Sequence, residues 1–341
     1  MSFLVLVAVV CLFWFFLLPL RWQTRQLAGP DPALRKAAAA ARRRKWEPAA
    51  RLLAETGEDW ERRALYSDVL GRVAARNGDG WLLAWEAARP YDPDAAVVRA
   101  RTRIAYAWRL RGKLGASATS RAKFARFHQA LWDSRDDLVR AARLNPADPT
   151  PHVAEVWMAM GLSYPNRDMH LLWREITERA PHHFDAHLSA LQYWCAKWHG
   201  SKQIARDFAE KAADDAPEGS LLAALPLIAW FENSDMAPPA ASFGSPRVRA
   251  MVDAALVDIA AAPDDHARLP YVRHLVGYVL VHQGRYREAV VQFRHVDGHL
   301  NGLPWRYYPE PFDALRYRAL RTRAARRSLF EKREKPEKRR R

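Results

Sequence analysis

The chain of 341 residues is built mainly from apolar positions that recur every three or four residues, separated by short turns containing Pro and Gly. This spacing is typical of amphipathic helices, whereas the strict alternation of apolar and polar residues seen in strands is scarce. One such segment begins at Asp59, an N-cap residue type, and ends at Asn77 and Gly78. The pattern therefore predicts an all-α protein of short helices joined by short turns.

The helical pattern becomes periodic in the middle of the chain. Pro146, Pro181 and Pro217 are separated by 35 and 36 residues, a period that indicates stacked pairs of helices. A longer helical stretch, 119–144, precedes them. A segment rich in Pro, Ser and Gly, 233–246, comes after them and is expected to form an insertion loop before the last helix pair.

Small residues interrupt the apolar pattern of residues 271–293 at Gly277, Gly284 and Ala289. Because Gly inside a helix costs roughly 0.5–1 kcal/mol relative to Ala, these positions suggest a structural requirement. We expect Gly277 and Ala289 to lie where two helices cross closely, and Gly284 to form the turn between them.

These positions resemble the tetratricopeptide repeat superfamily, whose two-helix unit has about 34 residues and a diffuse L-G-x-x-Y … A-x-x-x-F … P pattern. The resemblance implies an α-solenoid of stacked antiparallel helix pairs over residues 46–315, and it is clear in 134–217 and 270–297. Tyr193 and Arg273 depart from the pattern, standing where a small residue and an aromatic residue are usual. The Ala- and Arg-rich composition also resembles membrane-anchored actinobacterial proteins. The matching repeat positions are Gly200, Ala205, Ala212, Pro217, Gly277, Gly284, Ala289 and Phe293.

A continuous apolar stretch, residues 3–20, contains no charged side chain. As a helix it would be about 27 Å long, close to the roughly 30 Å hydrocarbon core of a bilayer. It lacks the basic start and the A-x-A-like exit of a cleaved signal peptide. Residues 1–22 are therefore predicted to be a single transmembrane anchor, with Arg21 and Trp22 at the membrane interface.

The net charge of +16 is concentrated at the two ends of the chain. Residues 21–51 carry a net charge of +7, residues 316–341 carry +10, and the remainder is nearly neutral at −1. Basic residues directly after an anchor favour a cytoplasmic location for the body of the protein, so we expect a single-pass protein of the cell membrane with most of the chain in the cytoplasm. The predicted organisation has a basic juxtamembrane segment, 23–45, and a basic C-terminal tail, 316–341. The tail is expected either to be simply solvated or to contact anionic lipid.

The residues most suggestive of chemistry lie between Pro181 and Gly200. His183 and His187 are four residues apart, as metal ligands on one helical face can be, and Cys195 lies farther along. However, Pro181 places His183 in a turn, Asp185 is expected in a cap or first-turn position, and no H-E-x-x-H motif is present. We therefore expect these side chains to serve in caps and packing.

The function predicted from these features is that of a membrane-anchored helical-repeat scaffold or adaptor that binds a protein partner, rather than an enzyme. The sequence provides no basis for assigning catalytic, cofactor or metal-binding residues, and twelve Trp residues after position 22 are expected to fill seams between helices. Two alternatives remain: a metal-dependent enzyme using His183, His187 and Cys195, or a regulator that contacts nucleic acid through its basic tail, which is the weaker option.

Overall fold

The structure, a computed structural model, describes residues 23–25, 27–112, 120–234, 238–300 and 302–330. Within these ranges the chain is helical and has no strand, apart from one isolated bridge between Thr24 and His299, which confirms the predicted all-α class. The α-helices are α2 Pro32–Arg42, α3 Glu47–Ala54, α4 Trp60–Asn77, α5 Gly80–Ala88, α6 Pro93–Arg111, α7 Arg121–Trp132, α8 Arg135–Leu144, α9 Thr150–Leu162, α10 Asn166–Arg179, α11 Phe184–Trp194, α12 Lys202–Asp214, α13 Leu225–Asn233, α14 Pro246–Ala261, α15 Leu269–His282, α16 Tyr286–Val296 and α17 Phe312–Ser328. Short 3₁₀ helices are η2 Leu222–Ala224, η3 Ala240–Gly244 and η4 Trp305–Tyr307.

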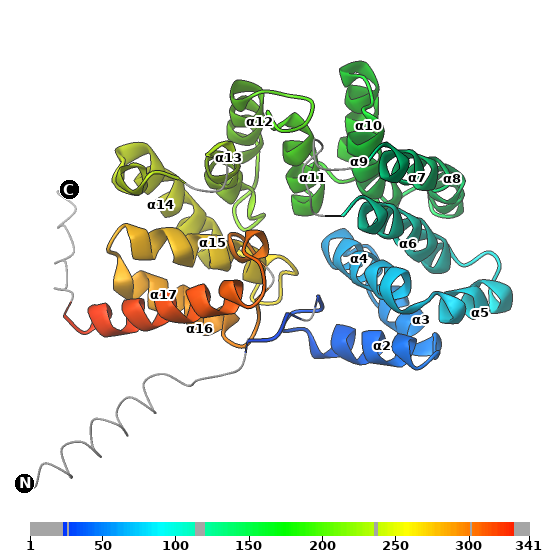
Figure 1. The fold of residues 1–341 in the computed structure, drawn as a ribbon, viewed down its shortest axis with the longest axis horizontal. Coiled ribbons are helices and arrows are strands. Elements are labelled where there is room, and N and C mark those ends of the chain that lie inside the picture. Colours follow the sequence, from blue (N-terminus) through cyan, green and yellow to red (C-terminus); the bar gives the residue numbers. More distant parts are fainter. Residues whose placement is uncertain (1–22, 26, 113–119, 235–237, 301, 331–341) are drawn as a thin grey trace, which may run out of the picture.

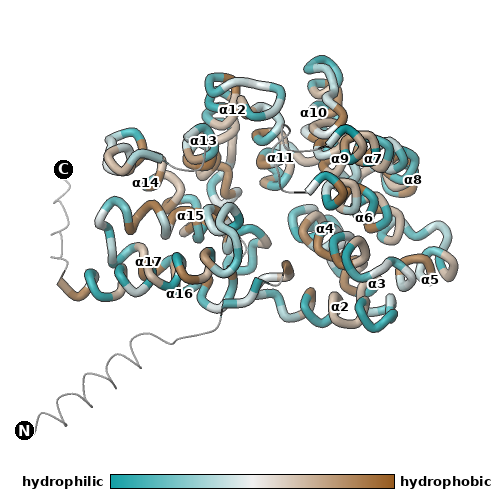
Figure 2. The backbone as a smooth tube through the Cα atoms, viewed as in Figure 1, coloured by the Kyte–Doolittle hydropathy of each residue, from teal (hydrophilic) through white to brown (hydrophobic). Residues whose placement is uncertain are grey.

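Many helices begin at a side-chain cap that the sequence encodes locally. Asp59 accepts a hydrogen bond from the backbone N–H of Arg62 at the start of α4, and Ser245 accepts one from Val248 at the start of α14, where Pro246 occupies the first helical position. Such caps satisfy backbone donors that the first helical turn leaves unpaired. Figure 2 shows apolar and polar stretches alternating along the helices, as expected for helices that bury one face.

The hydrophobic core is a series of clusters that run in order along the chain. The first is formed largely by α2–α6, the next by α6–α9, the third by α9–α12, and the largest extends from α11 to α17. Neighbouring clusters share helices, so each helix pair is buried by the pairs before and after it. This is the arrangement expected of stacked helical units. The three regularly spaced prolines each come after the second helix of a pair, at the ends of α8, α10 and α12.

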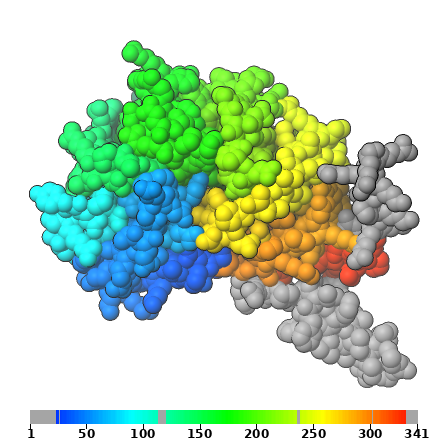
Figure 3. Space-filling model, turned by 180° about the vertical axis from the view of Figure 1, so that it is seen from behind, coloured from blue at the N-terminus to red at the C-terminus, as the bar shows by residue number. Residues whose placement is uncertain are grey.

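The two ends of this series lie against each other. Thr24 donates its backbone N–H to the carbonyl of Gly298, and its own carbonyl accepts from Leu300. Farther along, Arg62 of α4 donates to Asp265 in the turn before α15. Figure 1 shows the start of the described chain (dark blue) beside the C-terminal helices, and Figure 3 shows the segment near residue 265 against the N-terminal helices from behind. The helix stack is therefore curved until its ends meet.

Three boundaries differ from the sequence-based expectation. The stretch 119–144 is two helices, because the chain turns at Asp133 and Ser134 between α7 and α8. The segment expected to be juxtamembrane, 23–45, contains α2, whose Leu34 side chain is buried in the first core cluster. The expected start of the tail, residue 316, falls inside α17. In the last two cases an apolar face packs on the body even though the surrounding sequence is basic.

None of the helices within the described ranges combines the length and apolar composition needed to cross a bilayer. The predicted anchor, residues 1–22, with its interface residues Arg21 and Trp22, lies outside those ranges. The final part of the expected basic tail, residues 331–341, also lies outside them.

Candidate functional site

Helix α17 has one face packed on the body and the opposite face exposed. Its packed face consists of Asp313, Tyr317, Arg321 and Ala324, spaced three or four residues apart. Tyr317 lies against Phe293 of α16 and Trp305 of η4, with ring centroids 5.5 and 5.3 Å apart, respectively. These contacts hold the helix firmly on the body. The opposite side, which we call the α17 outer face, consists of Phe312, Leu315, Arg318, Ala319, Thr322, Arg323, Arg326, Arg327, Leu329 and Phe330.

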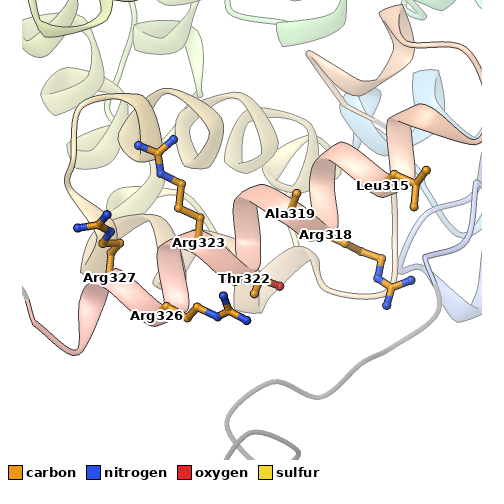
Figure 4. Close-up of a pocket in the computed structure, with 7 residues that line it drawn as sticks. All are labelled: Leu315, Arg318, Ala319, Thr322, Arg323, Arg326 and Arg327. Atoms are coloured by element: carbon orange, nitrogen blue, oxygen red, sulfur yellow. The ribbon is translucent and has the colours of Figure 1, made fainter.

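The α17 outer face combines exposed apolar side chains with arginines. Leu315 is 52% exposed and Phe330 is 84% exposed. Figure 4 shows Arg323 projecting to one side of the helix and Arg318 to the other. The depression on this surface is lined only by residues of α17, so it is an open surface and not an enclosed cavity.

Three of the four arginines of the outer face have no carboxylate partner within the described part of the chain. Arg318, Arg323 and Arg327 form no side-chain hydrogen bond or ion pair with any described residue, and Arg316 lies over the ring of Tyr308 at 4.4 Å. The only carboxylate of α17, Asp313, is buried on the packed face. The outer face is thus a row of positive charges without compensating acids on the same helix.

The start of α17 is joined to the beginning of the described chain. Arg25 donates through Nε and Nη2 to the two carboxylate oxygens of Asp313, at 2.6 and 2.5 Å. Gln23 donates to Asp297 at 3.0 Å, and Asp297 also pairs with Arg321 of α17. Together with the backbone pairing of Thr24, these contacts form a clamp between residues 23–25 and the last two long helices.

A second set of charges is buried and serves to join helices. Arg63 of α4 lies between Asp94 of α6 and Asp148 before α9, with N–O distances of 2.6 Å to each. Burial acts to lower the pKa of Arg63, but the two carboxylates outweigh it and the pKa is raised. Asp148 also accepts the backbone N–H of Thr150. The cluster fixes three helices at one point, and each charge in it has a partner.

A similar cluster surrounds Glu232 of α13 in the C-terminal half. Its buried carboxylate accepts from Lys197 at 2.6 Å and from the hydroxyl of Tyr307 at 2.7 Å, and it pairs with Arg306 at 3.3 Å. Burial acts to raise the pKa of Glu232, but the cations Arg306 and Lys197 outweigh it and the pKa is lowered. The carboxylate therefore stays ionised and links α13 to the segments containing residues 197 and 306.

The histidines considered as metal ligands serve at a junction between the two halves of the chain. His183 caps α11 by accepting the N–H of Ala186 at its Nδ1, while its Nε2 lies 3.1 Å from the carbonyl oxygen of Trp60. His187 is bonded through Nδ1 to the carbonyl of His183, and burial lowers its pKa to about 4. Asp185, in the first turn, pairs with Arg268. Both nitrogens of His183 are thus used within the protein.

Cys195 lies directly after α11 and is buried, and burial raises the pKa of its thiol to about 11. Across the part of the chain that the structure describes, no group of three or more His, Cys, Asp or Glu side chains has an arrangement that would hold a metal ion. His183, His187 and Cys195 are therefore not brought together as a ligand set, and no observation favours the metal-dependent alternative.

The predicted repeat positions occupy helix crossings and turns. A Cβ atom added at Gly277 of α15 would lie 2.9 Å from the ring of Phe293 on α16, so the two helices approach closely there, and Ala289 is fully buried nearby. Gly284 has a φ of +76° in the turn between α15 and α16. In the earlier unit, Gly200 lies in the turn before α12, where a Cβ would collide with the carbonyl oxygen of Trp194. Ala205 and Ala212 are buried on α12, and Pro217 comes after that helix.

Comparison with protein-family models, with curated proteins and with solved structures gives no match. The resemblance to the tetratricopeptide repeat superfamily and to actinobacterial membrane-anchored proteins therefore remains a prediction.

Sequence reasoning located some of these features and missed others. The basic character of residues 316–341 was visible in the composition, but the exposed apolar residues among the arginines become meaningful only once the packed face of α17 is known. Nothing in the local sequence signals that Arg25 pairs with Asp313, because the two residues are 288 positions apart. The same holds for Arg63 and Asp148, which are 85 positions apart.

Proposed function

We propose that the protein is a single-pass membrane protein whose helical-repeat body acts as a scaffold, holding another protein at the cytoplasmic face of the membrane. The observation that carries this proposal is the clamp between residues 23–25 and the C-terminal helices. The charge-free apolar stretch ends at Leu20, only a few residues before Arg25 forms its two hydrogen bonds with Asp313.

The clamp favours a rigid attachment over a flexible tether. A long linker would let a domain diffuse within a large volume, whereas the chain from Leu20 to Arg25 spans about 18 Å at most, even when fully extended. An anchor joined in this way would keep the body close to the membrane and restrict its orientation. A restricted orientation suits a platform that presents one surface to a partner.

The shape of the body also supports a scaffold. Stacked helix pairs expose long continuous surfaces, which repeat proteins use to bind other proteins. The exposed large apolar residues outside α17, such as Tyr91, Trp132 and Val257, lie on separate parts of the chain, and single exposed residues of this kind are normal.

Deletion of residues 1–22 tests the anchor. We expect the shortened protein to be released from membranes by a carbonate wash while its helical circular dichroism signal is unchanged, because side chains between Ala28 and Ala324 build the hydrophobic clusters that hold the helices together. If the shortened protein stayed in washed membranes, another part of the chain would be inserted and the single-anchor proposal would be wrong.

Crosslinking in native membranes tests the scaffold. The full chain should capture one recurrent protein, and a chain in which an unrelated single-pass helix replaces residues 1–20 should capture the same protein, since the body would carry the recognition. If the captured set depends on the anchor and not on the body, or if no protein recurs, the scaffold role would be rejected.

A further inference from the structure

Four of the large apolar side chains that are exposed in the described chain lie on or directly after one helix: Phe312, Leu315, Leu329 and Phe330 of the α17 outer face. Helical spacing places Phe312 and Leu315 on the side of α17 opposite Tyr317, and Leu329 and Phe330 follow directly after the helix; all four side chains are exposed. We propose that this face lies flat on an anionic lipid surface, as a second membrane contact beside the anchor. The inference rests on the proposed function, because it assumes the anchored topology.

The chemistry of the α17 outer face fits the boundary between headgroups and acyl chains. Phenylalanine and leucine partition into that boundary, while arginines pair with lipid phosphates at the same depth. Long arginine stems can lie along apolar surface while their guanidinium groups reach the headgroups. Arg318, Arg323 and Arg327 are free to do this because they have no partner among the described residues.

The position of α17 in the molecule brings this face to the membrane. Arg25 lies at most about 18 Å along the chain from the end of the apolar stretch at Leu20, and its side chain is bonded to Asp313 in the first turn of α17, so that end of the helix lies on the anchor side of the body. The helix is about 25 Å long. On the neighbouring helix, Arg287 donates to the carbonyl of Ser328 and adds another basic side chain near the far end of α17.

The same features favour lipid over nucleic acid. A nucleic-acid surface needs positive charge aligned with phosphates, and exposed Phe and Leu side chains would be left in water along the backbone of a duplex. A bilayer removes those apolar side chains from water, and its lipid phosphates pair with the arginines. The membrane therefore accounts for both components of the α17 outer face.

The proposal can be tested on the full chain in lipid nanodiscs with a fluorescent probe. An environment-sensitive nitrobenzoxadiazole label would be attached at Ala319→Cys, in the middle of the outer face, and at Leu171→Cys on α10 as a water-exposed control. Cys11 would be replaced by Ala, while Cys195 is buried and its raised thiol pKa protects it from labelling. The readout is the emission maximum and the rate of quenching by dithionite.

We expect the label at 319 to shift to the blue and to be quenched several-fold more slowly in nanodiscs containing phosphatidylglycerol than in neutral phosphatidylcholine nanodiscs. The label at 171 should be insensitive to lipid charge. Replacing Arg318, Arg323 and Arg327 with Gln should abolish the protection at 319, since each basic residue near such a surface changes partitioning by roughly fivefold. A matched variant removes three exposed arginines of α7 and α10 instead, by the changes Arg126→Gln, Arg167→Gln and Arg174→Gln. This variant should retain the protection of the label at 319.

Incorporation of the full chain into nanodiscs and protection of the label at 319 can fail independently. If the full chain does not incorporate into nanodiscs at all, the anchor has failed and the proposed function fails with it. If it incorporates but the label at 319 is quenched equally fast in both lipids, only the lipid contact is overturned. Protection at 319 by an added RNA or DNA oligonucleotide, without protection by anionic lipid, would overturn it in favour of nucleic acid.

Discussion

Helices α4 and α17 both carry arginines along most of their length, and the surroundings of those arginines differ. On α4, Arg62, Arg63 and Arg72 each pair with at least one carboxylate, and Arg63 is almost completely buried. On α17, Arg321 pairs with Asp297 on the packed face, whereas Arg318 on the outer face has no carboxylate partner among the described residues. The same residue type therefore joins helices in one region and remains available to an external anion in the other.

The difference arises from the number of neighbours each helix has. Helix α4 packs against α2, α6, α9 and α11, so its polar side chains lose water and need partners inside the protein. Among the described elements, helix α17 packs on α15, α16 and η4 along one side, and its other side is exposed. Arg63, which packing surrounds, is paired inside the protein, whereas Arg318, at the open side of a helix, keeps its charge in water, which is the condition that the proposed lipid contact requires.

The largest expected effect is at Arg63. Replacing Arg63 with Met leaves Asp94 and Asp148 buried next to each other without their cation, and should lower the free energy of unfolding by about 3–5 kcal/mol. Urea denaturation of the chain lacking residues 1–22 measures this. The matched change on α17, Arg318→Met, should alter the free energy of unfolding by no more than about 0.5 kcal/mol. If the two variants lost the same free energy of unfolding, the arginines of α4 and α17 would not differ in their contribution to stability.

A smaller effect is expected at Gly71, where α4 crosses α6. A Cβ atom there would lie 2.7 Å from the Cβ of Arg101 and 2.9 Å from its carbonyl carbon, so the two backbones would have to separate. Gly71→Ala should destabilise the protein by roughly 1–3 kcal/mol despite the higher helix propensity of Ala. Gly80→Ala is the control, because no atom lies within 4 Å of the added Cβ. If Gly71→Ala were as stable as Gly80→Ala, the close crossing would not exist in solution.

The smallest expected effect on stability concerns the clamp at the start of α17. Burial acts to raise the pKa of Asp313, but the hydrogen bonds and charge of Arg25 outweigh it, so the pKa is lowered in the folded protein. The clamp therefore contributes stability above the unfolded pKa of about 3.9, and the contribution is lost as the pH falls through the folded value. Because Arg25 is about one third exposed, we expect Arg25→Gln to cost about 0.5 kcal/mol at pH 7.

The effect of Arg25→Gln on stability should depend on pH, because it acts through the ionised carboxylate of Asp313. Arg25→Gln should raise the pKa of Asp313 in an NMR titration of the carboxylate, and its stability should approach that of the unmodified protein once the pH is below both pKa values. The control Arg318→Gln should leave the Asp313 titration unchanged. A stability difference that stays the same from pH 7 to acidic pH would show that Arg25 acts through packing instead of charge.

Much of the local structure could be predicted from the sequence. Asp59 and Ser245 cap helices as their positions indicate, the three regularly spaced prolines lie just after helices, and Gly284 forms a turn with positive φ. These features depend on residues within one or two helical turns of each other. The break at Ser134 was missed because neither Pro nor Gly marks it, and the buried hydroxyl of Ser134 donates to the carbonyl of Leu131 instead.

The sequence predicts the positive charge of the α17 outer face but not which side chains form that face. The excess of arginine after residue 316 predicts contact with an anion, but that count also includes Arg321, which the fold buries and pairs with Asp297. Likewise, His183 and His187 have the spacing of metal ligands, yet both are used in backbone hydrogen bonds at the junction of α4 and α11. Spacing along the chain cannot tell a ligand from a cap.

The sequence by itself determined the all-helical class, most helix ends and the uneven distribution of charge, because caps, turns and amphipathic periodicity act over a few residues. Only the tertiary structure decided that the helix stack curves until Arg25 meets Asp313, that Arg63 is a buried link between three helices, and that one face of α17 stays open. Those outcomes depend on contacts between residues up to 288 positions apart, whose energies arise only when the packed helices exclude water from some charges and leave it around others.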